Sequence, residues 1–241
     1  MGNLLETRPR GVSWWRELAA EQGHNTFLMA FSRGKDSIAA TLSLLEAGFD
    51  LIPFTMIGVP GLSFVEESLT YYERVLFGGR HIIRAMYPHF ARIFTEGAYQ
   101  PPERLAIAEA CGFGFDISHI QNSILQGLDM PADTYTAIGV RAFDNMMRRK
   151  IIAVNGPVVA SKRQFYSIWD MSIAQLINII TRHDVNLPPD YRLWGHSFYE
   201  IQPEYLFAIR EHYPDDYRKI LEWFPLAQAE MFRFDHMVNA A

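Results

Sequence analysis

The feature that most constrains the fold is an apolar segment that runs directly into a short polar turn and then into a helix. Residues 28–37 read Leu-Met-Ala-Phe-Ser-Arg-Gly-Lys-Asp-Ser, and an alanine- and leucine-rich stretch follows them through Ala47. The first N–H groups of a helix have no partner within the helix, and the helix macrodipole places partial positive charge there. A strand, a tight turn and a helix start therefore predict an anion-binding site.

The side chains of the turn favour phosphate as the anion. Gly34 lets the backbone approach a ligand, Lys35 adds a positive charge, and Ser32 and Ser37 add hydroxyl donors. The spacing matches neither the Walker pattern G-x-x-x-x-G-K-[ST] nor the dinucleotide fingerprint G-x-G-x-x-G. At this point an ordinary strand–turn–helix junction, capped by Ser32 or Asp36, remains the alternative.

The turn resembles the PP-loop, S-G-G-x-D-S, of the N-type ATP pyrophosphatases and sulfonucleotide reductases. The matching residues are Ser32, Gly34, Asp36 and Ser37. Arg33 departs from the pattern, because it stands where the PP-loop has its first glycine. If that position requires a positive φ, an arginine there costs on the order of 1 kcal/mol. The same arginine equally offers a further phosphate donor.

Three later segments extend the resemblance, in the same order as in the phosphoadenosine-phosphosulfate (PAPS) reductase-like family. Residues 61–67 are similar to its T-G-x-x-F-P-E-T stretch, and residues 137–148 to its G-x-R-x-x-x-S-x-x-R stretch. The matching residues of these two segments are Gly61, Phe64, Glu66, Gly139, Arg141 and Arg148. Residues 166–195 resemble its P-I-x-D-W-[ST] turn, the helix after it and a Leu-Tyr-x-x-Gly close. The chain thus resembles this branch of the PP-loop superfamily over most of its length.

Apolar segments alternate with helical patterns along the chain. Strands are predicted at residues 24–31, 51–57, 80–86 and 133–140, with helices between them. The pattern of residues 97–131 is less clear: a helix is predicted from residue 101 to Ala110, and residues 111–114 break it. Such alternation implies right-handed crossovers and a parallel sheet. The resemblance implies an α/β fold of the adenine nucleotide alpha hydrolase-like type, with an open, mainly parallel twisted sheet and helices on both faces.

The domain organisation follows from a change of texture after Phe198. Residues 1–198 are predicted to form the nucleotide-binding domain. Residues 199–241 contain blocks rich in aromatic and acidic residues, separated by prolines. They are predicted to form a C-terminal helical extension packed on that domain.

Ligands of parallel α/β sheets bind beyond the carboxyl ends of the strands, so the turn, residues 59–66 and Arg141 are expected to face one crevice. The resemblance implies that this crevice binds a nucleotide. The predicted nucleotide- and phosphate-binding residues are Ser32, Arg33, Gly34, Lys35, Asp36, Ser37, Gly61, Gly139, Arg141 and Arg148. Lys35, Asp36 and Arg141 are the predicted catalytic residues. Asp36 is also a candidate Mg²⁺ ligand, with helix capping as the equal alternative. Arg148 is either a contact to an acidic co-substrate or part of a solvated helix face.

Composition sets limits on cofactors, partners and location. A net charge of −5 and a pI near 5.9 argue against a generally basic surface, so nucleic acid is expected only as the substrate of a larger assembly. The single cysteine, Cys111, cannot build a cysteine-rich site, so neither zinc nor an iron–sulfur cluster is expected. The chain shows no signal core and no membrane-spanning run, and a cytoplasmic location is predicted. A protein partner and a homo-oligomer both remain open.

The C-terminus limits the chemistry. Residues 232–241 contain no cysteine, whereas assimilatory sulfonucleotide reductases carry theirs in a Glu-Cys-Gly-x-His tail. Because that reaction needs a thiol, reduction of PAPS by this chain's own tail is not expected.

The leading prediction is an enzyme that uses ATP (or adenylyl sulfate or PAPS) with Mg²⁺, cleaves ATP between the α and β phosphates, adenylates an acceptor and releases pyrophosphate. The alternatives are a non-catalytic nucleotide-binding subunit and a sulfonucleotide reductase that uses an external thiol.

Overall fold

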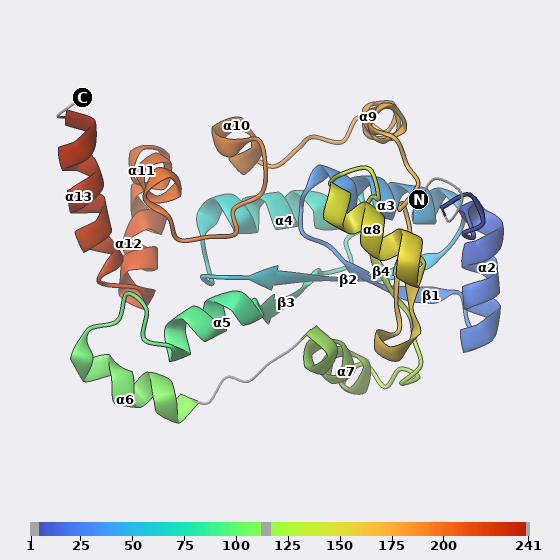
Figure 1. Cartoon of the computed structure of the whole chain (residues 1–241), viewed down its shortest axis with the longest axis horizontal. Coiled ribbons are helices and arrows are strands. Elements are labelled where there is room, and N and C mark those ends of the chain that lie inside the picture. Colours follow the sequence, from blue (N-terminus) through green and yellow to red (C-terminus); the bar gives the residue numbers. More distant parts are fainter. Residues whose placement is uncertain (1–4, 112–116, 240–241) are drawn as a thin grey trace. The chain divides into compact units, whose positions relative to one another are not determined.

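The computed structural model describes residues 5–111 and 117–239 (Figure 1). Within these residues six strands form one sheet, in the order β3-β2-β1-β4-β6-β5. The strands are β1 (Thr26–Ala30), β2 (Asp50–Ile57), β3 (Ile83–Met86), β4 (Thr136–Ile138), β5 (Val158–Val159) and β6 (Gln164–Tyr166). β1 pairs in parallel with β2 and β4, β4 pairs in parallel with β6, and β5 pairs antiparallel with β6. The predicted α/β fold with a mainly parallel sheet is confirmed.

Helices connect and flank these strands. Those of the described residues are α2 (Gly11–Gln22), α3 (Lys35–Glu46), α4 (Ser63–Val75), α5 (Pro88–Thr95), α6 (Pro102–Cys111), α7 (Ile117–Gly127), α8 (Met146–Asn155), α9 (Ile173–Arg182), α10 (Asp190–Trp194), α11 (Pro203–His212), α12 (Pro214–Trp223) and α13 (Ala227–Asn239), with a short 3₁₀ turn η1 (Ala160–Lys162). In this part of the chain no helix has the length and apolar character needed to cross a membrane.

The chain divides into two compact units, each built from separate segments. The first comprises residues 1–55, 71–83 and 118–187, and the second comprises residues 56–70, 84–117 and 188–241. The predicted C-terminal extension is helical, and its helices α11 to α13 belong to the second unit together with α5, α6 and α10. The boundary expected at residue 198 stays a prediction.

The core of the first unit is built around β1. Phe27, Leu28 and Met29 are fully buried, because a central strand of a parallel sheet is covered on both faces. The ring of Phe27 lies 4.9 Å from that of Phe165 on β6, and Trp14 of α2 packs edge-on against Phe165 at 5.8 Å. Each such side chain contributes roughly 1.5–3 kcal/mol on burial. The start of α3 is therefore attached to a rigid strand.

A buried glutamine joins α2 to the beginnings of β1 and β4. The side-chain nitrogen of Gln22 donates to the carbonyl oxygens of His24 and Thr26, each at 2.8 Å. Its side-chain oxygen accepts from the backbone N–H of Tyr135, also at 2.8 Å. Buried polar groups paired in this way specify one arrangement, because any other leaves them unsatisfied. The two strands that precede the candidate site thus share one anchor.

The second unit has an aromatic core. Phe90 packs against Phe198 and Phe224, each at 6.1 Å between ring centroids, and Phe64 packs against Tyr213 at 5.1 Å.

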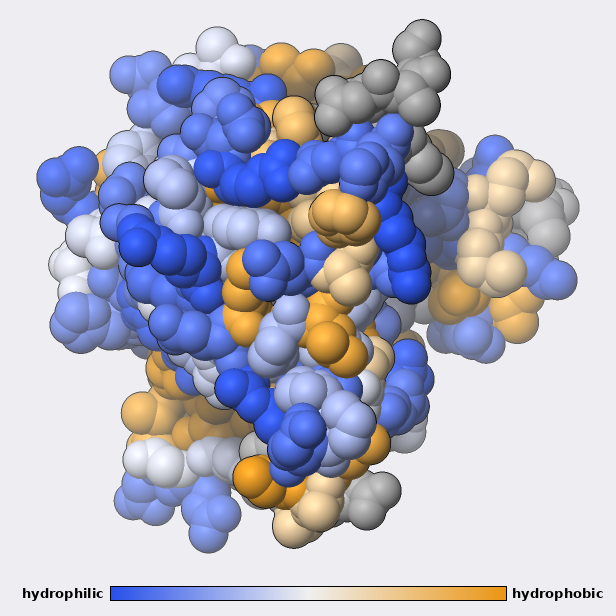
Figure 2. Space-filling view, turned by 90° about the vertical axis from the view of Figure 1, so that its left-hand side faces the viewer, coloured by the Kyte–Doolittle hydropathy of each residue, from blue (hydrophilic) through white to orange (hydrophobic). Residues whose placement is uncertain are grey.

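Figure 2 shows one face of the molecule, on which hydrophobic residues lie in several groups among hydrophilic ones. Exposed apolar residues of this kind are usual on protein surfaces.

Candidate phosphate-binding site

The predicted phosphate loop lies between β1 and α3, as the sequence indicates. Arg33 has a φ of 63°, so the position does require the left-handed conformation that a glycine adopts without strain. The arginine is 4% exposed. Gly34 is the N-cap residue of α3, with extended dihedral angles, so neither Ser32 nor Asp36 occupies the N-cap position proposed as the alternative.

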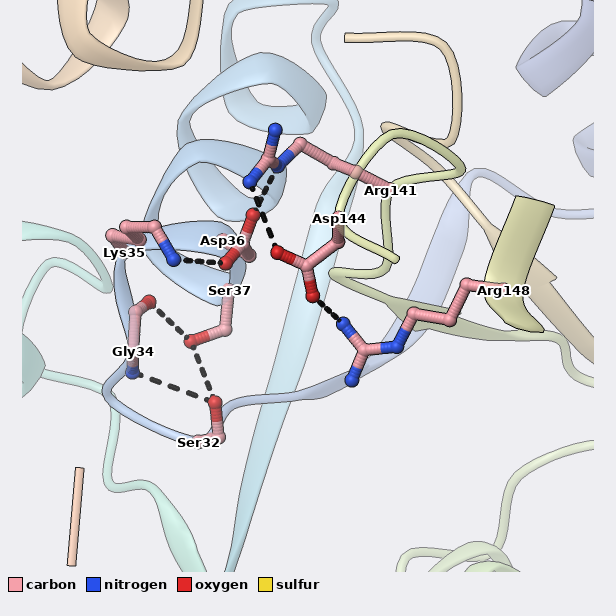
Figure 3. Close-up of polar contacts among 8 residues, drawn as sticks. All are labelled: Ser32, Gly34, Lys35, Asp36, Ser37, Arg141, Asp144 and Arg148. Carbon is pink, nitrogen blue, oxygen red and sulfur yellow. Dashed lines mark hydrogen bonds and ion pairs between the residues drawn. The ribbon is translucent and has the colours of Figure 1, made fainter. Parts of the chain in front are cut away.

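Two serine hydroxyls close the loop on itself (Figure 3). Ser32 Oγ donates to Ser37 Oγ at 3.2 Å, and Ser37 Oγ donates to the carbonyl oxygen of Gly34 at 2.9 Å. The backbone N–H of Gly34 donates to Ser32 Oγ at 3.4 Å. These bonds hold the turn in a defined shape at the positive end of the α3 dipole.

Two cations converge on one carboxylate at the start of α3. Lys35 Nζ lies 2.9 Å from Asp36 Oδ2, and Arg141 Nε contacts Asp36 Oδ1 (Figure 3). The Arg141 side chain is only 5% exposed, so its charge needs such a partner. Because both oxygens of Asp36 already face cations, a Mg²⁺ ion could use this carboxylate only after an ion pair opened, and the metal role of Asp36 stays a prediction.

The topology explains why Asp36 and Arg141, 105 positions apart in the sequence, meet. β1 and β4 are parallel neighbours, with Ala30 beside Ile138 in the register. The loop leaves the carboxyl end of β1, and Arg141 follows the carboxyl end of β4, so both emerge at one edge of the sheet. The structure therefore brings the loop and Arg141 together, as expected.

Gly139 is the point where β4 touches the start of α3. A Cβ atom built on Gly139 would lie 2.7 Å from the carbonyl oxygen of Asp36 and 2.8 Å from the Cα of Ser37. Both neighbours are backbone atoms, which cannot swing aside. Only glycine fits here, and this gives the predicted site residue a steric role.

Asp144 was not among the predicted site residues. Its Oδ1 lies 3.4 Å from Arg141 Nη2, and its Oδ2 contacts Arg148 Nη1 (Figure 3). Arg148 lies in the first turn of α8, whose N-cap is Asn145, with Oδ1 accepting from the backbone N–H of Arg148 at 2.8 Å. The sequence did contain a signal for this contact, because Asp144 lies three residues after Arg141 and four residues before Arg148.

Trp169, within residues 166–195, contacts the backbone beside Arg141. The carbonyl oxygen of Trp169 accepts from the backbone N–H of Ala142 at 2.7 Å, next to Arg141. The Trp169 ring is fully buried, and its Nε1 donates to the carbonyl oxygen of Pro9 at 3.0 Å. Burial raises the pKa of the neighbouring Asp170 carboxyl, which lies 4.0 Å from Arg10. These contacts fix the backbone on which Arg141 stands.

Gly61 and Cys111, both singled out in the sequence, belong to the second unit. Gly61 has a φ of 73°, and its carbonyl oxygen accepts a hydrogen bond from Lys219. Its role in nucleotide binding stays a prediction. Cys111 is the last residue of α6, and its side chain is outside the described part of the structure.

Comparisons with known proteins identify little at the level of sequence. No model of a known protein family matches the chain, and no curated protein sequence matches it. Among solved structures, the chain is similar to the U34-tRNA thiolase NcsA from Methanococcus maripaludis, which carries a [4Fe-4S] cluster. The match covers 89% of this chain and 77% of that chain, with 11% sequence identity and a TM-score of 0.44. This likeness concerns the general fold only.

One prediction about cofactors is corrected by this comparison. The sequence led us to expect no iron–sulfur cluster, and the NcsA structure contains one, so that expectation is withdrawn. Between residues 5 and 111 and between 117 and 239, no group of three or more His, Cys, Asp and Glu side chains is arranged to hold a metal ion. Because iron–sulfur clusters are held mainly by cysteine thiolates and this chain has one cysteine, no chemical step is assigned to a cluster here.

Proposed function

We propose that residues 32–37 and Arg141 bind the phosphates of an adenine nucleotide. The observation that carries the proposal is the meeting of Lys35 and Arg141 at the N-terminus of α3. These two cations already contact an anion, the carboxylate of Asp36 in the first turn of α3. A phosphate group is likewise an anion that accepts hydrogen bonds through its oxygens, and a guanidinium can bind two of these oxygens through two parallel hydrogen bonds. The adenine part of the ligand rests on the resemblance to the PAPS reductase-like PP-loop family.

The reaction proposed for the site is cleavage of ATP between its α and β phosphates. An oxygen of the acceptor attacks the α-phosphorus and forms a new P–O bond. The bond from that phosphorus to the bridging oxygen of the β-phosphate breaks, and its electron pair leaves with pyrophosphate. Lys35 and Arg141 would stabilise the charge that grows on the leaving group, which is the main protein contribution in such reactions. The proposal does not specify the acceptor, which could belong to a nucleic acid bound within a larger assembly.

Replacing Lys35 tests the proposal. Lys35→Ala is expected to weaken binding of ATP and of pyrophosphate by about tenfold to a hundredfold, since a hydrogen bond to a charged group contributes about 1.5–3 kcal/mol. Lys162→Ala is the matched control, because Lys162 is an exposed lysine of the same unit in η1. Titration calorimetry measures both. Equal affinities in the two variants, or no binding by the unaltered protein, would contradict the proposal.

A second candidate is a nucleotide-binding subunit without turnover. It is favoured by Arg33, which has a φ of 63° and stands where the PP-loop pattern has its first glycine, because a loop altered at this position could bind a nucleotide and no longer cleave it. Labelled ATP offered with candidate acceptors separates the two functions. Release of pyrophosphate supports the enzyme, whereas ATP binding without release, with and without added partners, supports the subunit.

A further inference from the structure

Asp144 has no role in the function proposed so far, yet it contacts Arg141 of the proposed site and also Arg148, which the sequence predicts to bind the nucleotide. One of its oxygens lies 3.4 Å from Arg141 Nη2 and the other contacts Arg148 Nη1. The contacts continue from Lys35 through Asp36 to Arg141, then through Asp144 to Arg148 (Figure 3). Three cations thus alternate with two carboxylates in one chain of contacts.

The two arginines depend on Asp144 in different ways. Arg141 is buried, and Asp144 contacts its Nη2 while Asp36 contacts its Nε, so Asp144 restrains the guanidinium even when a ligand displaces Asp36. Arg148 is 41% exposed, so without a partner its long side chain would sample many rotamers. A carboxylate that contacts both fixes the direction of each guanidinium before a ligand arrives.

We propose that Asp144 is a positioning residue, which holds Arg141 and Arg148 in the orientation that binds a pyrophosphate group. This inference rests on the proposed nucleotide-binding function and adds to it a residue that does not itself contact the ligand. Restraining side chains in advance increases affinity, because the ligand then does not have to order them.

Positioning by Asp144 and the negative charge of Asp144 predict opposite changes in phosphate affinity when the residue is neutralised. Asp144 is an anion close to a site for anions, so if it acted only through its charge, its neutralisation would tighten phosphate binding. If it positions the two arginines, the same change weakens binding, because both guanidinium groups lose their restraint. Asp144→Asn keeps the shape of the side chain and removes the charge, so it separates the two effects.

The experiment is a calorimetric titration of the whole chain with pyrophosphate and with ATP. Asp144→Asn is expected to weaken pyrophosphate binding about fivefold, and Asp144→Glu to retain affinity within about twofold of the unaltered protein. Asp133→Asn is the control for charge: it is an exposed aspartate of the same unit, but it precedes β4 whereas Asp144 follows it. It is expected to leave the affinity unchanged or slightly tighter.

Two further measurements distinguish positioning from a structural effect. The loss caused by Asp144→Asn should shrink in an Arg148→Ala background, because one of the two positioned groups is then absent. The midpoints of thermal unfolding of Asp144→Asn and Asp144→Glu should agree. Agreement would show that the weaker binding of Asp144→Asn is not caused by partial unfolding. Unchanged or tighter binding by Asp144→Asn would overturn the inference and leave the proposed function standing. Absence of binding by the unaltered protein would overturn both.

Discussion

Gly139→Ala is expected to abolish nucleotide binding and to lower the free energy of unfolding by about 2–3 kcal/mol. The added methyl group would lie within 2.8 Å of backbone atoms of Asp36 and Ser37, closer than real Cβ atoms come. The backbone must therefore shift where β4 meets the first turn of α3. That turn holds Lys35 and Asp36, so the shift separates the groups that meet Arg141.

Gly127→Ala is the matched control for this substitution. Gly127 is the last residue of α7 in the same unit, and nothing lies within 4 Å of a Cβ built on it. Alanine in a helix is ordinarily more stable than glycine, by up to about 1 kcal/mol. Urea denaturation gives the stability of both variants, and calorimetry with ATP gives their affinity. A Gly139→Ala protein that binds ATP as well as the Gly127→Ala protein would contradict the steric role.

The elements that can be predicted from this sequence are those with a strong local pattern. The strand expected at 51–57 is β2 (Asp50–Ile57), because a continuous apolar run marks a strand buried on both faces. The strand expected at 133–140 is shorter, since β4 pairs only over Thr136–Ile138. α7 lies within residues 97–131, where the sequence pattern is unclear, and its buried positions include the polar Gln121, which weakens the helical pattern. β5 has two residues and no pattern to detect.

Some features of the candidate site can likewise be predicted from the sequence, and others cannot. The loop and Arg141 can be located from sequence, because each follows an apolar strand and parallel strands end at one edge of a sheet. The ion pairs cannot, since they depend on rotamers and on how closely β4 approaches α3. Arg33 illustrates the limit: the resemblance to the PP-loop indicates that a positive φ could be needed there, and the structure shows a φ of 63° in a residue that is nearly buried.

The second large effect is expected in the other unit, from Asp216→Ala. Asp216 on α12 is completely buried, and it accepts hydrogen bonds from Ser63 Oγ at 2.7 Å and from the backbone N–H of Phe64 at 3.3 Å. Lys219 Nζ lies 3.1 Å from its other oxygen. Asp216 thus satisfies a donor in the first turn of α4 from more than 150 residues further along the chain. Its removal is expected to cost about 3–4 kcal/mol, as for other broken buried pairs.

The effect of Asp216→Ala should also depend on pH. Burial alone would raise the pKa of the Asp216 carboxyl, but hydrogen bonds from Ser63, Lys219 and Phe64 outweigh burial and hold the pKa below its ordinary value. A group whose pKa is lower in the folded state stabilises fully above its unfolded pKa, about 3.9 for aspartate, and loses that effect as the pH falls through the folded pKa. The difference in stability between the unaltered protein and Asp216→Ala should therefore be largest near neutral pH and shrink below about pH 4.

Asp215→Ala is the control for this prediction, because Asp215 is the preceding residue, with a side chain that is 77% exposed and paired at the surface with Arg218. Surface pairs of that kind contribute about 0–1 kcal/mol, so this variant should remain close to the unaltered protein. Urea denaturation measures both variants from pH 7 to pH 3. Hydrogen exchange at residues 63–70 reports on the start of α4, where Asp216→Ala should increase the rate and Asp215→Ala should not. Equal denaturation curves for the two variants would show that the buried carboxylate does not hold α4 to the C-terminal helices.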